Sequence, residues 1–117
     1  SECIEAGAKT VMVGHILQPA YTRYFSAYVK DGDILPASMS RELVTGLLRG
    51  KLGFNGLVVT DSTAMAGLAT HIPRETLVPI TIAAGCDMFL FTKNLEEDIE
   101  NKKKGKRKKE KFFLREL

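Results

Sequence analysis

A short apolar run that ends on an acid is the feature that most constrains how this chain can fold. The run is residues 56–61, GLVVTD. It is too short for a helix and rich in β-branched residues, as in strands buried in a parallel sheet. Asp61 stands at its carboxyl end, where the loops of α/β proteins converge and functional groups collect. The run predicts an α/β fold in which Asp61 is a candidate functional residue, unless Asp61 only caps the following turn.

A helix is predicted just before this strand, over residues 41–52. Its apolar residues recur at spacings of three and four, and Ser40 is a suitable N-cap. Gly53 follows as a helix stop. We expect Arg49 and Lys51 to be exposed helix charges rather than ligands.

The rest of the chain repeats this alternation. Residues 10–16 and 87–92 are further apolar runs that predict strands. Residues 74–84 predict a helix, in which Pro79 implies a kink or a late start near Val78. The order β, loop, α, β, loop, α, β favours parallel strands joined by helices.

Between the first strand and the first helix lies a long polar and aromatic segment, residues 17–35. Its rings are Tyr21, Tyr24, Phe25 and Tyr28. In a loop above an active site such rings can stack on a sugar. The competing interpretation is a loop that packs on its own aromatic side chains.

Four motifs, in order, resemble those of family 3 glycoside hydrolases. Residues 47–61, LLRGKLGFNGLVVTD, are similar to the active-site signature of that family. Residues 11–16, VMVGHI, resemble its strand that ends on a histidine, and residues 35–40, LPASMS, its Pro-Ala-Ser segment. Residues 83–88, AAGCDM, are similar to its Ala-Gly-x-Asp-Met turn. Because Asp87 begins a strand, at the end opposite to that of Asp61, we interpret it as a turn acid and not as a catalyst.

The resemblance implies a fold and a nucleophile. A (β/α)8 TIM barrel needs about 250 residues, so we expect a partial TIM barrel holding about the last three βα units. Asp61 would be the catalytic nucleophile of a retaining β-glycosidase and would stay ionised. His15 would contact a substrate hydroxyl, although a lone His beside an apolar run is usually a satisfied core or loop residue. Met65 would line the sugar pocket, although a Met more often serves packing.

The resemblance also implies what is missing. In the β-N-acetylglucosaminidase branch, the acid/base pair lies upstream of the His15 strand, near a Lys-His-Phe-Pro-Gly motif that this sequence lacks. We therefore predict that the chain alone is inactive. β-N-acetylhexosaminidase is the favoured activity and β-glucosidase the other candidate. Ser62 and Thr63 replace the Asp-Leu pair often found in the former branch, and His71 has no counterpart, so we interpret it as structural.

Charge divides the chain into two parts. Residues 1–100 carry eight basic and twelve acidic residues, a net charge of −4, whereas residues 101–117 carry nine and two, a net charge of +7; together they give the total of +3. We assign residues 1–100 to the partial catalytic barrel and expect a further helix to start in residues 94–100. Residues 101–117 read as an irregular, disordered basic tail, from a frame shift, a damaged gene or a dedicated arm. In the alternative function, a non-catalytic α/β domain uses this arm to bind nucleic acid or another anionic partner.

Composition bears on location and partners. Cys3 and Cys86 show neither metal spacing nor a CxxC motif, so we interpret both as reduced core thiols, which favours the cytoplasm. No apolar run reaches the length of a membrane span. We expect no cofactor, no metal and no membrane contact. The expected partners are a β-linked sugar and the missing half of the barrel, with nucleic acid disfavoured.

Overall fold

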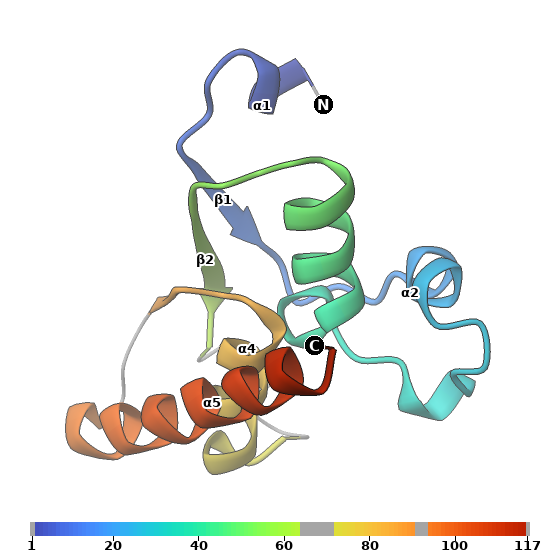
Figure 1. Cartoon of the computed structure of the whole chain (residues 1–117). Helices are drawn as coiled ribbons and strands as arrows, with labels where there is room; N and C mark the ends of the chain where they lie inside the picture. Colours follow the sequence, from blue (N-terminus) through green and yellow to red (C-terminus); the bar gives the residue numbers. More distant parts are fainter. Residues whose placement is uncertain (1, 64–71, 91–93, 117) are drawn as a thin grey trace.

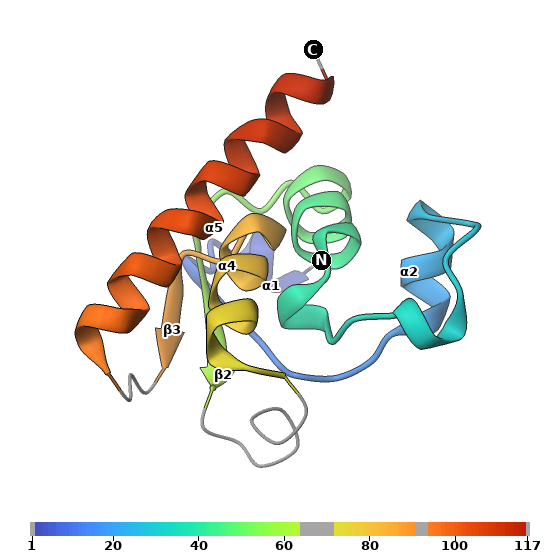
Figure 2. The ribbon, with the colours of Figure 1, turned by 90° about the horizontal axis from the view of Figure 1, so that it is seen from below.

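A three-stranded parallel sheet forms the centre of the molecule. The computed structural model describes residues 2–63, 72–90 and 94–116. The strands are β1 (Thr10–Val13), β2 (Leu57–Ser62) and β3 (Met88–Leu90), in the order β1-β2-β3 (Figures 1 and 2). This is the sheet of consecutive βα units that the sequence predicts.

Helices cover one face of this sheet and leave the other open. Side chains alternate between the two faces of a strand, and Val58 and Thr60 are fully buried. Val58 packs with Val44 of the helix η3 (Glu42–Lys51) and with Cys86. On the other face, register pairs Met12 and Met88 with Val59 of β2, which is buried, whereas Met12, Met88 and Leu57, two residues before Val59, are exposed.

Helix η3 begins and ends as its sequence predicts. The Leu43 N–H donates to Ser40 Oγ at 3.3 Å, so Ser40 caps the first turn. The helix is of the π type and ends with the Leu52 N–H bonded to the Leu47 carbonyl. Gly53 follows with φ of +69°, the left-handed conformation that suits glycine at a helix end.

The aromatic segment contains a helix of its own, α2 (Pro19–Phe25), followed by the short helices η1 (Asp31–Asp33) and η2 (Ala37–Met39). Tyr24 packs edge-to-face on Phe25, with ring centroids 5.0 Å apart. Tyr28 is exposed. Tyr21 and Tyr24 are exposed as well, so the rings make one packing contact, and stacking on a sugar stays a prediction.

The single-turn helix α1 (Glu2–Glu5) corrects one prediction at the N-terminal end. Cys3 lies in it and is exposed, so it is not a core thiol. The reason is that α1 has no buried residues. Cys86 is a buried, reduced thiol, as the sequence predicts.

Helix α4 (Arg74–Ala84) starts at Arg74, so a late start near Val78 was wrong. Pro79 lies inside the helix and is buried. The Leu77 N–H donates to the Pro73 carbonyl, so the first turn of the helix is closed before the chain reaches Pro79.

Helix α5 (Leu95–Glu116) corrects the expectation of an irregular, disordered tail. The basic run continues the helix, which lies along α4 (Figure 2). Asp98, Asn101 and Gly105 recur at spacings of three and four and are buried. A polar and small-residue face thus packs α5, in place of the apolar face that helix patterns are searched for. In the described ranges, no helix is long and apolar enough to cross a membrane.

Candidate active site

Asp61 lies near the carboxyl end of β2. Thr60 just before it is fully buried, and the register between β2 and β3 shifts between Val59 and Ser62, so Asp61 lies at an irregularity of the strand. The carboxylate is half-buried, and its Oδ1 accepts a hydrogen bond of 2.7 Å from the N–H of Ser62. Asp61 thus combines a charge-assisted hydrogen bond with a position near the carboxyl end of a parallel strand, the end at which barrel enzymes carry their active sites.

His15 lies two residues after β1 and reaches the end of β2. Its Nδ1 is 2.7 Å from Ser38 Oγ, and its Nε2 is 3.0 Å from the carbonyl oxygen of Ser62. The residue is therefore next to the segment that carries Asp61. Both ring nitrogens already have partners within the chain.

A second set of contacts holds the residue that follows Ser62. The hydroxyl and the N–H of Thr63 both donate to the carbonyl of Leu90, at 3.1 and 3.3 Å. Arg74 donates to the Thr63 hydroxyl at 3.1 Å and binds both carboxylate oxygens of Asp98 at 2.6 Å. These hydrogen bonds to Asp98 raise the pKa of Arg74, against the opposing effect of burial. The end of β2 is therefore tied to β3, α4 and α5.

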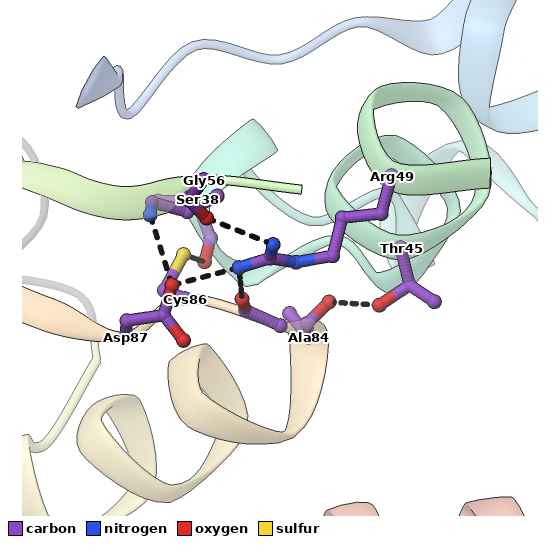
Figure 3. Close-up of polar contacts among 9 residues, drawn as sticks. Ser38, Thr45, Arg49, Gly56, Ala84, Cys86 and Asp87 are labelled. Atoms are coloured by element: carbon purple, nitrogen blue, oxygen red, sulfur yellow. Dashed lines mark hydrogen bonds and ion pairs between the residues drawn. The ribbon is translucent and has the colours of Figure 1, made fainter. Parts of the chain in front are cut away.

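The other end of the strands holds Arg49 of the signature (Figure 3), whereas Lys51 is exposed, as expected, with its ammonium group over the ring of Tyr24. Arg49 donates to the carbonyls of Gly56 and Gly85 and to Asp87 Oδ2, at 3.1, 3.0 and 2.7 Å. The expectation that Arg49 is an exposed helix charge was wrong, because its guanidinium binds these three groups and its side chain is partly buried. Asp87 also accepts from the Val58 N–H, so it is the structural acid of a turn, as the sequence predicts.

Two residues named from the sequence lie outside the described residues, namely Met65 and His71. Sequence reasoning missed Ser38 as the partner of His15, although the Pro-Ala-Ser motif marks its position. It also missed the Arg74–Asp98 pair, for which no local signal exists because the two residues are 24 positions apart. Within residues 2–63, 72–90 and 94–116, no group of three or more His, Cys, Asp or Glu side chains is arranged to hold a metal ion.

Comparison with known proteins identifies the family that this chain resembles. The model of the family described as "Glycosyl hydrolase family 3 N terminal domain" matches residues 1–111. A "Beta-N-acetylglucosaminidase/beta-glucosidase" of Cellulomonas fimi is 65% identical over 95 residues, which are 81% of this chain and 17% of that protein.

Solved structures agree with this match. A structure described as "Beta-glucoside phosphorylase BglX bound to 2FGlc" superimposes with a TM-score of 0.79 at 45% identity, over 87% of this chain and 18% of that one. A family 3 β-N-acetylglucosaminidase of Paenibacillus sp. str. FPU-7 gives a TM-score of 0.70 at 30% identity, over 89% and 18%. The chain thus spans less than a fifth of the length of these relatives. With its parallel βαβαβ order and a matched family model along nearly all its length, this chain belongs to the N-terminal domain family of the family 3 glycosyl hydrolases.

Proposed function

We propose that this chain forms part of the barrel of a retaining β-glycosidase and that Asp61 is the catalytic nucleophile of that enzyme. The observation that carries the proposal is the half-buried carboxylate near the carboxyl end of β2, within a signature that resembles that of the family. The Ser62 N–H donates to Asp61 Oδ1 at 2.7 Å and orients the carboxylate. A carboxylate held this way is ready to attack an anomeric carbon bound at the carboxyl ends of the strands.

The proposed reaction has two displacements. A carboxylate oxygen of Asp61 forms a bond to the anomeric carbon, while the bond to the leaving oxygen breaks and an acid protonates that oxygen. A second acceptor then attacks the anomeric carbon and releases Asp61. We assign the acid to a part of the barrel that precedes these residues, so the 117-residue chain is expected to be inactive alone.

The preferred acceptor is water and the preferred substrate a β-linked N-acetylhexosamine, because the relatives include proteins named β-N-acetylglucosaminidase and β-hexosaminidase. A β-glucoside is the other candidate sugar. Phosphate is a second candidate acceptor, favoured by the 45% identity to a structure described as a β-glucoside phosphorylase. His15 and Met65 stay predicted substrate contacts, and a cytoplasmic location stays part of the proposal.

The proposal can be tested in a chimera that supplies the rest of the barrel. Residues 1–100 of this chain replace the corresponding segment of the Cellulomonas fimi relative, whose matched segment is 65% identical. Release of p-nitrophenol from aryl β-N-acetylglucosaminides and β-glucosides is followed with and without inorganic phosphate. We expect activity in the chimera and a loss of about 10³-fold or more in Asp61→Ala.

Asp33→Ala, which removes an exposed carboxylate, serves as the matched control. An active chimera whose rate is unchanged by Asp61→Ala would remove Asp61 from the reaction. A rate that depends on phosphate would assign phosphate as the acceptor and leave the role of Asp61 intact.

A further inference from the structure

The imidazole of His15 joins three segments that are far apart in the sequence. Its Nε2 is 3.0 Å from the Ser62 carbonyl oxygen, which can only accept a hydrogen bond. The proton of the neutral ring is therefore on Nε2, and Nδ1 is an acceptor. Ser38 then donates its hydroxyl to Nδ1 at 2.7 Å. One tautomer of His15 satisfies both partners.

Ser38 is built into the core and cannot reach a substrate. It is fully buried in η2, and its carbonyl accepts from the thiol of Cys86 at 3.4 Å (Figure 3). A Ser–His hydrogen bond can indicate an activated nucleophile. Burial of Ser38 excludes that role here, and its hydroxyl instead fixes the orientation and tautomer of the His15 ring.

Ser62 connects this pair to Asp61. Its carbonyl is held by His15, while its N–H donates to Asp61 Oδ1 at 2.7 Å. The following residue, Thr63, is bonded to Leu90 of the neighbouring strand. The backbone on the carboxyl side of Asp61 is therefore fixed from β1 on one side and from β3 on the other.

We propose that His15 and Ser38 are positioning residues for the nucleophile, which act through the backbone of Ser62. This inference rests on the proposed role of Asp61. Without the hydrogen bond to His15, the backbone of Ser62 is held less firmly, so the Ser62 N–H that supports the carboxylate is less well aligned. Positioning groups of this kind affect turnover because small displacements of a nucleophile are costly.

The first test needs no catalysis and uses the 117-residue chain labelled with ¹⁵N in histidine. Nuclear magnetic resonance of the ring should show the Nε2–H tautomer of His15 in the wild type and a mixture of tautomers in Ser38→Ala. Backbone amide exchange at Ser62 and Thr63 should become about tenfold faster in Ser38→Ala and in His15→Ala.

The matched control is Thr60→Val, which removes a buried hydroxyl that has no hydrogen-bond partner within the described residues. It should change neither the tautomer of His15 nor exchange at Ser62. A wild-type ring with its proton on Nδ1, or unchanged exchange in both Ser38→Ala and His15→Ala, would overturn the proposal whatever Asp61 does.

The second test uses the chimera and separates positioning from direct contact with sugar. We expect Ser38→Ala and His15→Ala each to lower kcat about tenfold with little change in KM, and their combination to cost no more than the larger single effect. His15→Gln retains an N–H donor near the position of Nε2 and should recover most of kcat.

A rise in KM in His15→Ala, with Ser38→Ala equal to the wild type, would overturn positioning and assign His15 to the substrate. A chimera that keeps its rate in Asp61→Ala would instead refute the proposed function, while the tautomer and exchange results would still decide the connection among Ser38, His15 and Ser62.

Discussion

At the scale of single residues, partners that are distant in the sequence decide what each side chain does. Their positions at opposite ends of strands predict different roles for Asp61 and Asp87. The structure places the two residues at opposite ends of the parallel strands. Arg49 was misassigned, because the carbonyls that it binds belong to turns rather than to its own helix. A sequence indicates the residue type of a side chain but not the tertiary acceptors that it meets.

The contacts of Arg49 predict a cost on its removal. Arg49→Ala should lower the free energy of unfolding by about 1–2 kcal/mol, because it removes the Arg49 donor from two carbonyls and leaves Asp87 with the Val58 N–H alone. Arg49→Lys should recover only part of this, since an ammonium group cannot serve three acceptors arranged around a planar guanidinium. Urea unfolding of the chain measures the difference.

The control for this experiment is Arg23→Ala. Arg23 pairs with Asp31 in an exposed setting, where the side chains are 44% and 89% accessible. Such pairs contribute about 0–1 kcal/mol. Equal effects of Arg49→Ala and Arg23→Ala would show that Arg49 makes no special contribution.

In contrast to Arg49, we do not expect removal of the Thr60 hydroxyl to lower the free energy of unfolding. Its side chain is fully buried, and its Oγ1 has no hydrogen-bond partner in the described part of the chain. Thr60→Val keeps the shape and removes this hydroxyl, so we expect stability to be unchanged or to rise by about 1 kcal/mol. The comparison is Thr81→Val, which removes a buried hydroxyl bonded to the Leu77 carbonyl at 2.8 Å. A larger loss in Thr60→Val than in Thr81→Val would contradict this reading of Thr60.

At the scale of elements, the strands, the two helices that cover the sheet and the start of α5 could be predicted, and the continuation of α5 through the basic run could not. The periodicity of apolar residues and the glycines at the ends of helices located β1, β2, η3 and α4 to within a few residues. The tail lacks an apolar stripe, and its helix packs through Asp98, Asn101 and Gly105 instead. Lysine-rich segments are compatible with a helix once one face is anchored, and that anchor is a tertiary contact.

Gly105 tests whether α5 packs on α4 as described. Alanine favours helices by about 1 kcal/mol over glycine. A Cβ at this position, however, would lie 2.7 Å from the Pro79 carbonyl oxygen and from Ile82 Cβ. We therefore expect Gly105→Ala to destabilise the chain and to speed amide exchange in α5.

Lys104→Ala changes an exposed neighbour and should be neutral in the same measurements. Thermal unfolding followed by circular dichroism gives the comparison. If Gly105→Ala raises the melting temperature, helix propensity alone governs this segment, and the close contact with α4 does not form.

At the scale of the whole molecule, the open face of the sheet is the main feature that the family explains. Met12, Leu57 and Met88 are 56%, 39% and 45% exposed on it, although each lies in a strand. In a complete barrel the interior is filled by such side chains. The length of the chain already predicted an incomplete barrel, because 117 residues provide too few strands to close one.

The open face predicts how the isolated chain behaves. We expect it to bind a hydrophobic dye and to associate as its concentration rises, because exposed apolar surface next to free strand edges favours association. Met12→Lys combined with Met88→Lys should reduce both effects with little loss of stability. Sedimentation velocity measures the association, and a wild-type chain that stays monomeric and does not bind dye would show that the face is covered.

Covalent trapping of Asp61 tests the central claim most directly. The chimera is treated with a 2-deoxy-2-fluoro β-glycosyl fluoride, whose leaving group needs little help from an acid, and the digested protein is examined by mass spectrometry. If Asp61 is the nucleophile, the fluoroglycosyl group is found as an ester on the peptide that contains Asp61, and Asp61→Ala is not labelled. A stable label on any other carboxylate, with Asp61 unmodified, would contradict the account.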